Sequence, residues 1–188
     1  MTIRIVAIGG TVSPGSTTEL ALRIAVAGAE AQGAEVTFFG GDYLAALPYY
    51  GGPGHSAKVG AELVEAVRSA DGVLIASPGY HGTPSGMVKN ALDYLEELAR
   101  DERPYLDGRP VGLIATAYGD QATMSTMQTL RSVAHALRGW PTPLGATVRS
   151  YKGLFGADGE CLDDKIRGTL TIVGEQVVQG ARSFARRD

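Results

Sequence analysis

Apolar positions along the chain follow two alternating patterns. Short runs rich in β-branched residues predict strands, and these runs are 3–8, 35–39, 72–76, 110–117 and 144–149. Apolar residues spaced three or four apart predict helices, and these segments are 17–32, 57–70, 84–98, 121–138 and 162–186. The segment 40–56 shows neither pattern and is expected to be a long loop. Strands that alternate with helices predict a parallel sheet with helices on both faces.

The alternation of predicted strands and helices limits the possible strand orders of the sheet. Right-handed crossovers leave few arrangements for a parallel sheet. Five strands fit the flavodoxin-like order 2-1-3-4-5 better than a six-stranded dinucleotide-binding fold. We therefore expect an α/β, three-layer αβα sandwich in which residues 1–188 form one domain.

Composition excludes several classes of partner and site. The net charge of −3 gives no basic surface for nucleic acid or an anionic membrane. Cys161 is the single cysteine, so neither a disulfide framework nor a cysteine-rich metal site is expected, and no other metal site is predicted. No apolar run reaches the ~20 residues of a membrane-spanning helix. The N-terminus enters a strand directly without a signal peptide, so we expect a cytoplasmic protein.

The loop after the first strand carries an unusual number of hydroxyl groups. It lies before a predicted helix, whose N-terminus presents unpaired amides and a positive dipole to an anion. It is neither a Walker A loop nor a Gly-x-Gly-x-x-Gly loop. The hydroxyls that could bind a terminal phosphate belong to Thr11, Ser13, Ser16, Thr17 and Thr18.

Ser16 has a second interpretation. Ser16 and Glu19 have the spacing of a capping box, which needs no ligand. Both roles stay open, because a capping side chain is also able to face a phosphate. Five hydroxyls in so short a loop are harder to explain by capping alone.

The segment 77–95 is the most informative in the chain. Pro78 and Gly79 are expected to end the strand before it. Thr83 and Pro84 predict a helix start, with Thr83 as the N-cap and Pro84 at the first helical position. The turn between them then lies at the carboxyl end of a strand, where open α/β sheets bind ligands.

These two loops resemble those of the NADPH-dependent FMN reductase family, which includes quinone, azo and chromate reductases. The first is similar to its hydroxyl-rich phosphate loop. The second is similar to its motif Ser-Pro-x-Tyr-x-Gly-x-x-Ser-Gly-x-x-Lys-Asn-Ala-Leu-Asp, here from Ser77 to Asp93. A third loop, 117–120, stands where the family has a glycine-rich turn near the flavin.

The resemblance implies an FMN site. Ser13, Ser16, Thr17 and Thr18 would hold the phosphate, and Tyr118 and Gly119 would lie near the flavin. The edge of the isoalloxazine ring would contact Pro78, Gly79, Tyr80, His81 and Gly82. The family also implies a homodimer or homotetramer, and we expect Leu44, Leu47, Tyr49 and Tyr50 to be exposed for such contacts.

The chain departs from the family pattern at several positions. Ser13 stands where an arginine is frequent, and Thr11 stands at the serine position. Tyr118 replaces a small residue, often glycine, and His81 replaces asparagine. The first departure weakens the expected phosphate and NADPH binding, and Tyr118 alters flavin access or the shape of the substrate site.

The resemblance implies a flavin oxidoreductase that passes electrons from NADPH or NADH, through FMN, to a small-molecule acceptor. The acceptor would be a quinone, a dye, a metal oxyanion or free flavin. No catalytic acid or base is assigned, because the cofactor carries the chemistry. Two alternatives stay open: a reductase that releases reduced FMN to a monooxygenase partner, and a flavodoxin-type electron-transfer protein without NAD(P)H oxidation.

Overall fold

The computed structural model describes residues 2–54 and 58–185. Residues 55–57 and 186–188, which include the ends of the expected loop and helices, lie outside the described residues. The elements in chain order are β1 Ile3–Gly9, α1 Thr17–Ala31, β2 Ala34–Phe39, α2 Gly41–Ala46, α3 Lys58–Ser69, β3 Gly72–Tyr80, β4 Thr83–Pro84, α4 Gly86–Asp93, the 3-10 helix η1 Tyr94–Leu98, β5 Pro110–Ala117, α5 Asp120–Ala136, β6 Trp140–Pro141, β7 Ala146–Arg149 and α6 Asp164–Ala185.

A sheet runs through the middle of the molecule. It has seven strands in the order β2-β1-β3-β5-β6, with β4 also paired to β3 and β7 also paired to β5. All pairings are parallel except that of β3 with β4. The prediction of five parallel strands in the order 2-1-3-4-5 is therefore wrong. Strands β4 and β6 have two residues each, too few to produce a recognisable pattern in the sequence.

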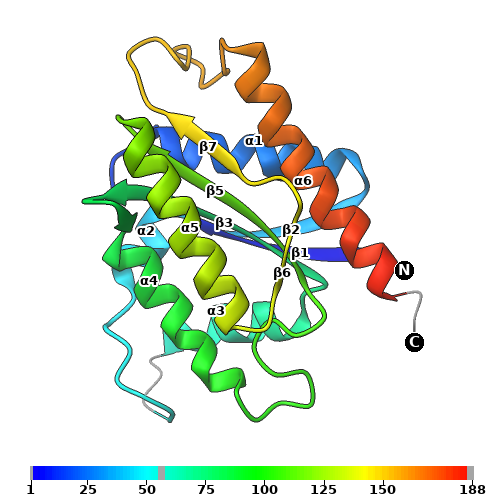
Figure 1. Ribbon diagram of the computed structural model, residues 1–188. Helices are drawn as coiled ribbons and strands as arrows, with labels where there is room; N and C mark the ends of the chain where they lie inside the picture. The colour runs from blue at the N-terminus through cyan, green and yellow to red at the C-terminus, as the bar shows by residue number, and fades with distance from the viewer. Residues whose placement is uncertain (1, 55–57, 186–188) are drawn as a thin grey trace.

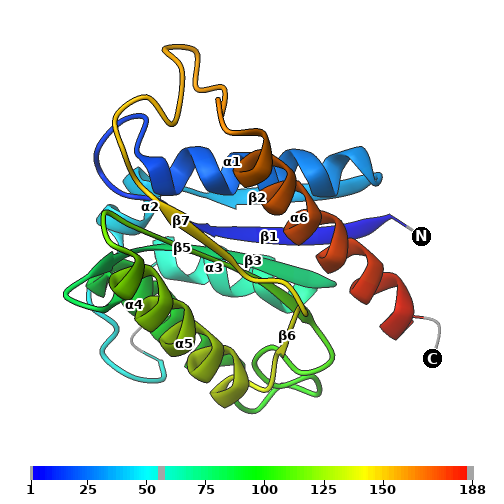
Figure 2. The same ribbon diagram turned by 45° about the horizontal axis from the view of Figure 1, so that its top comes forward.

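Helices cover both faces of the sheet, as predicted. Helices α1 and α6 lie together on one face, and α3, α4 and α5 lie on the other (Figures 1 and 2). Alternate residues of β1 enter different cores: Ile5 and Ala7 pack beneath α1 and α6, whereas Val6 and Ile8 pack on the opposite side. Burial on both faces explains why β1 is an unbroken apolar run. Among the residues described, no helix combines the length and apolar character needed to cross a membrane.

The segment expected to be a long loop contains a helix. Helix α2 begins directly after β2, and Leu44 and Leu47 are buried in the core beneath it. The prediction that these two leucines are exposed is wrong, because a short helix turns them toward the sheet. Tyr49 is exposed and Tyr50 is partly buried.

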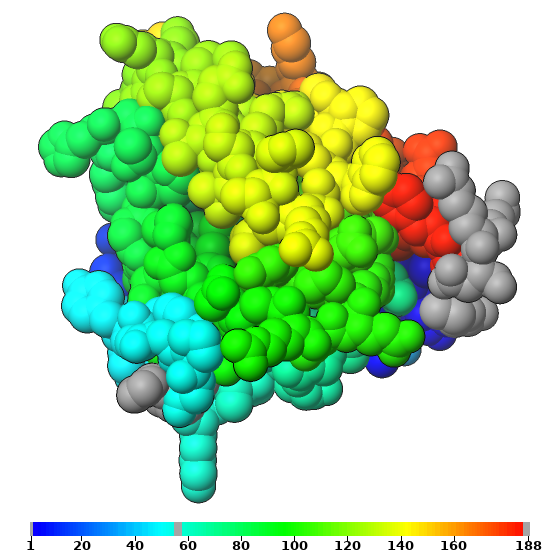
Figure 3. Space-filling model, turned by 60° about the horizontal axis from the view of Figure 1, so that its bottom comes forward, coloured from blue at the N-terminus to red at the C-terminus, as the bar shows by residue number. Residues whose placement is uncertain are grey.

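The chain that follows α2, cyan in Figure 3, lies against the green segment that contains α4 and η1. Polar side chains bond the two segments to each other. The Asn90 amide accepts from the Tyr50 backbone N–H at 2.9 Å and donates to the Pro48 carbonyl oxygen at 2.9 Å. The Tyr50 hydroxyl donates to Glu97 at 3.3 Å. Burial, together with the negative charge of Glu97, raises the pKa of Tyr50 to about 12.

Alkaline pH is expected to destabilise the fold through Tyr50. The folded state keeps the phenolic proton up to a pKa of about 12, whereas an unfolded tyrosine loses it near pH 10. The contribution of Tyr50 is therefore complete below pH 10 and is lost as the pH rises through about 12. Thermal unfolding between pH 8 and 12 should show a steeper loss of stability in the wild type than in Tyr50→Phe. Parallel pH profiles would contradict this assignment.

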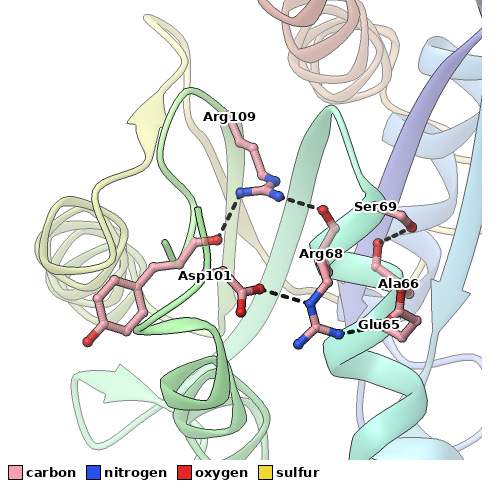
Figure 4. A network of polar contacts seen from close by, with 7 residues as sticks. Glu65, Ala66, Arg68, Ser69, Asp101 and Arg109 are labelled. Atoms are coloured by element: carbon pink, nitrogen blue, oxygen red, sulfur yellow. Dashed lines mark hydrogen bonds and ion pairs between the residues drawn. The ribbon is translucent and has the colours of Figure 1, made fainter. Parts of the chain in front are cut away.

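At the opposite end of the sheet, where β5 begins, a buried arginine forms hydrogen bonds with backbone carbonyl groups (Figure 4). Arg109 is 1% exposed and donates to the carbonyl oxygens of Arg68, Ala70 and Tyr105 at 2.7–3.0 Å. Burial and the nearby charge of Arg103 lower the pKa of Arg109 to about 10. Arg109 thus satisfies carbonyls at the end of α3 and has a structural role far from the carboxyl edge of the sheet.

Candidate functional site

A cleft of about 430 Å³ lies at the carboxyl edge of the sheet. Strands β1, β3 and β5 end there, on the left side of Figure 1. The chain leaves β1 toward β2 on one side and returns as β3 on the other, so the cleft lies at the switch point of the sheet. Its lining residues are Thr11, Ser13, Gly15, Ser16, Thr17, Thr18, Pro78, Gly79, Tyr80, Thr116, Ala117, Tyr118 and Ser150.

The first wall of the cleft is the loop between β1 and α1. Ser16 is the N-cap of α1, and its Oγ accepts from the Glu19 backbone N–H at 3.3 Å. The return bond of a capping box is replaced, because the Ser16 backbone N–H donates to the Ser13 carbonyl oxygen at 3.2 Å, and the Glu19 carboxylate pairs with Arg23 at 2.7 Å. Within residues 2–54 and 58–185, the backbone N–H groups of Thr17 and Thr18 have no hydrogen-bond partner. These two amides therefore stay available to an anion.

The hydroxyls of this loop are not equally available to a ligand. The Thr18 Oγ1 lies 2.6 Å from the Thr116 Oγ1 in a buried hydrogen bond between α1 and β5. Thr11 Oγ1 accepts from the Ser13 backbone N–H at 3.2 Å and shapes the loop. Ser13 is exposed, and Ser16 and Thr17 are partly exposed. A phosphate in the cleft would therefore meet these three hydroxyls, whereas Thr18 would contribute its backbone N–H.

A close backbone contact fixes the position of the loop. Gly41, the first residue of α2, packs directly against Thr11. A Cβ atom at Gly41 would lie 1.9 Å from the Thr11 carbonyl oxygen. The glycine is thus required for the loop to approach α2 this closely.

The second wall is a hairpin that the sequence did not reveal. Strand β3 continues through Pro78 and Gly79 to Tyr80, so the expectation that these residues end the strand is wrong. Thr83 and Pro84 form β4 and pair with β3, and they do not begin the helix. The N-cap is Ser85, whose Oγ accepts from the Val88 backbone N–H at 3.2 Å. The antiparallel pairing moves the helix start beyond the predicted position.

The hairpin is held at its base and at its tip. At the base, the Ser77 Oγ accepts from the Ser85 backbone N–H at 2.9 Å. At the tip, His81 and Gly82 have φ values of 51° and 87°, a pattern that tight two-residue hairpins favour. The Ser125 hydroxyl of α5 donates to the Gly82 carbonyl oxygen at 2.6 Å. The turn therefore has a defined position above the sheet edge.

The third wall follows β5. Tyr118 is strongly exposed, and its carbonyl oxygen accepts from Arg149 Nε at 3.2 Å. Gly119 is the N-cap of α5 and has no side chain to cap it. A smaller hollow of about 370 Å³ borders this wall and is lined by His81, Gly82, Gly119, Gln121, Ala122 and Ser125.

The structure brings most of the predicted site residues into the cleft, while His81, Gly82 and Gly119 line the neighbouring hollow. Sequence reasoning missed Thr116 and Ser150. Thr116 lies inside a buried strand without a motif. Ser150 directly follows β7, and its position after a strand of the same parallel sheet is the signal that would have found it.

A family model for NADPH-dependent FMN reductase matches residues 3–152, most of the chain. The chain belongs to the NADPH-dependent FMN reductase family. The matched range contains all three walls of the cleft and ends just after Ser150.

Two curated relatives are named as FMN-dependent or NAD(P)H-dependent reductases. The chain is 32% identical over 120 residues to an FMN-dependent NADPH-azoreductase of Staphylococcus haemolyticus, covering 64% of this chain and 55% of the relative. It is 29% identical over 124 residues to an NAD(P)H-dependent FMN reductase of Pseudomonas aeruginosa, covering 65% and 63% of the two chains. The match thus spans between about half and two thirds of each relative's length.

Solved structures confirm the flavodoxin-like α/β fold of this reductase-family chain. FerB, a flavoenzyme NAD(P)H:acceptor oxidoreductase from Paracoccus denitrificans, superimposes with a TM-score of 0.79 at 18% identity, covering 97% of this chain and 98% of FerB. A flavodoxin, WrbA-like protein from Agrobacterium tumefaciens gives a TM-score of 0.67 at 18% identity, covering 97% and 99%. At such identities the likeness concerns the fold.

Proposed function

We propose that this protein is an NAD(P)H-dependent flavin oxidoreductase that binds FMN in the cleft and passes electrons from NADPH or NADH to a small-molecule acceptor. The observation that carries the proposal is the arrangement of the cleft. It combines free amides and hydroxyls at the N-terminus of α1 with a fixed turn at the end of β3. Its volume of about 430 Å³ lies in the range of small-molecule sites.

The lining chemistry fits FMN. Ser13, Ser16 and Thr17, with the backbone N–H groups of Thr17 and Thr18, would bind the phosphate. Pro78, Gly79 and Tyr80 on one side and Tyr118 and Gly119 on the other would border the flavin ring, with His81 and Gly82 at its edge. Bound FMN would supply hydride and electron transfer. The protein would orient the ring and shield it from water, with no side chain acting as a catalytic acid or base.

We also propose one FMN-binding domain over residues 1–188 and assembly into a homodimer or homotetramer. Leu44 and Leu47 are buried and therefore provide no surface for such contacts. Exposed Val12, Tyr80 and Tyr118 instead provide apolar surface near the cleft. Light scattering at micromolar concentration should give at least twice the chain mass of 19.6 kDa, and a value near 19.6 kDa would contradict assembly. The cytoplasmic location stays a prediction.

A second candidate function is a reductase that uses FMN as an exchanging substrate and delivers reduced flavin to a monooxygenase. It is favoured by the neutral lining of the cleft, in which the described residues include neither lysine nor arginine. A phosphate held without a cationic side chain lacks the strongest kind of charge-assisted hydrogen bond. FMN would then be released more easily than from a loop that binds the phosphate with a lysine or arginine side chain.

Spectroscopy and titration test the proposed function. Purified protein loaded with FMN should show flavin absorbance bands and should oxidise NADPH or NADH when a quinone is added. FMN should bind more tightly than FAD, because α1 provides one phosphate site and the cleft has no evident place for adenine. FAD binding about tenfold tighter than FMN, or 1.4 kcal/mol, would contradict the phosphate assignment. Retention of FMN through gel filtration separates a prosthetic group from an exchanging substrate.

Replacing Ser16 with alanine should lower both stability and FMN affinity. Loss of the bond to the Glu19 N–H should cost about 1 kcal/mol of unfolding free energy. Loss of a hydrogen bond to phosphate should cost about 1.5–3 kcal/mol of binding free energy. Urea unfolding of the protein without ligand and quenching of FMN fluorescence measure the two effects separately. A fall in stability with unchanged FMN affinity would make Ser16 a helix cap alone.

A further inference from the structure

A hollow of about 330 Å³ lies at the end of the sheet where β5 begins, away from the cleft. We call it the arginine hollow, and its lining residues are Arg68, Asp101, Glu102, Arg103 and Arg109. Figure 4 shows Arg68 in the last turn of α3 beside Asp101, with Arg109 close to the first residue of β5. Every side chain of this lining is charged at neutral pH, and the function proposed above uses none of them.

Two of the arginines lie close together. Arg109 Nε and Arg103 Nη1 both donate to the carbonyl oxygen of Ala70, at 3.0 Å and 3.2 Å. Arg103 also donates to the carbonyl oxygens of Asp107 and Gly108, each at 2.8 Å. Carbonyl groups thus hold two guanidinium groups side by side, although their like charges repel each other.

Neither of these two guanidinium groups is in contact with a carboxylate. Within residues 2–54 and 58–185, the ion pairs closer than 4.0 Å include neither Arg103 nor Arg109. The C-terminal dipole of α3 supplies only about half of a negative charge to balance them. A buried charge without a paired counterion is costly, and Arg109 is only 1% exposed.

The acidic residues around the arginine hollow are bonded elsewhere or act from a distance. Asp101 pairs with Arg68 at 2.8 Å, and the Asp71 carboxylate accepts from the Arg4 backbone N–H at 2.8 Å. Attraction from Asp71, Asp101 and Asp107 partly offsets the lowered pKa of Arg109. Glu102 is exposed at the border of the hollow. An anion that reached Arg103 and Arg109 would therefore not have to displace a carboxylate from either.

Both guanidinium groups keep donors for such an anion. A guanidinium has five N–H donors in a planar fork. In the described part of the chain, Arg103 and Arg109 each use three of these donors, one on each nitrogen. One N–H on each terminal nitrogen is left over. Charge-assisted hydrogen bonds from these donors to an oxyanion are of the strongest kind.

We propose that the arginine hollow binds a tetrahedral dianion, phosphate or sulfate, between Arg103 and Arg109. The anion would provide the missing counterion and would link the end of α3 to the segment that precedes β5. Because it would bind the folded chain alone, it should also raise the Tm. The site lies at the opposite end of the sheet from the cleft, so the proposal does not depend on FMN binding.

Calorimetric titration of sodium phosphate, at an ionic strength kept constant with sodium chloride, tests the proposal. Phosphate should bind in the arginine hollow with half-saturation at about 1 mM, and sulfate should bind within about threefold of that value. The titrations are run with and without FMN, because the FMN phosphate is expected to occupy the N-terminus of α1. Binding in the arginine hollow should persist when FMN is present.

Two variants and a matched control locate the site. Arg103→Gln should weaken phosphate binding at least about tenfold, because it removes charge-assisted hydrogen bonds. Glu102→Gln should strengthen binding about twofold to threefold, because it removes a nearby negative charge from the surface without a recognised bond of its own. Glu160→Gln makes the same change at an exposed position before α6, outside the arginine hollow, and should leave binding unchanged.

Several results would overturn the proposal. They are the absence of saturable binding up to about 20 mM phosphate, binding that FMN abolishes, and equal strengthening by Glu102→Gln and Glu160→Gln. Binding that Arg103→Gln leaves intact would also overturn it. If Arg103→Gln fails to fold, the comparison of the two glutamine variants at Glu102 and Glu160 decides. A wild type that binds phosphate but no FMN would contradict the proposed function while leaving the anion site supported.

Discussion

Gly41→Ala is expected to displace the phosphate-binding loop and to weaken both folding and FMN binding. The new Cβ would lie 1.9 Å from the Thr11 carbonyl oxygen and 2.4 Å from its carbon. Both are backbone atoms, so no side-chain rotation relieves the overlap, and the loop or α2 has to move. Overpacking of this kind costs about 1–3 kcal/mol of unfolding free energy. Displacement of Ser13 and Ser16 should weaken FMN binding about tenfold.

Gly168→Ala is the matched control for this variant. Gly168 lies within α6, and a Cβ there would meet no atom within 4 Å. Alanine in place of an interior helical glycine should leave stability equal or raise it by up to about 1 kcal/mol. Urea unfolding and FMN fluorescence quenching of both variants give the comparison. Wild-type stability and affinity in Gly41→Ala would show that α2 does not position the loop.

The layers of the fold could be predicted because each depends on repeated patterns. Strand β1 is buried on both faces, so Ile5 and Val6 are both apolar although they enter different cores. Helices α1, α5 and α6 are long enough to show a periodic apolar face. Such signals identify the sheet, its covering helices and therefore the edge at which a ligand would bind.

The missed features are short and depend on contacts distant in sequence. Thr83 and Pro84 have the composition of a helix start, but antiparallel pairing with β3 places them in a strand. Helix α2 spans six residues, and the burial of Leu44 depends on its packing against the sheet. Thr18 was expected to offer its hydroxyl to a phosphate, yet that hydroxyl bonds to Thr116 across the core. Local propensity does not determine such contacts.

Gly82→Val is expected to remove FMN binding almost completely, whereas His81→Ala should retain FMN and change turnover or acceptor preference. Gly82 has a φ of 87°, a conformation that a β-branched residue adopts only under strain. Its Cβ would also lie 3.0 Å from the Ser125 Oγ, which holds the tip of the hairpin. Strain of about 1–3 kcal/mol would therefore reopen the turn. His81 has an exposed side chain, so its truncation leaves that geometry intact.

Gly33→Val separates the local effect from a general loss of stability. Gly33 has a similar φ of 80°, has no atom within 4 Å of its Cβ position, and follows α1 at the end away from the cleft. Both valine variants should lose about 1–3 kcal/mol of unfolding free energy, because the backbone strain is comparable. Gly82→Val alone should lose FMN, measured as flavin per chain after gel filtration together with NADPH oxidation by a quinone. Full FMN content and turnover in Gly82→Val would show that the hairpin does not form the flavin site, because the strain would then act on a turn that no ligand contacts.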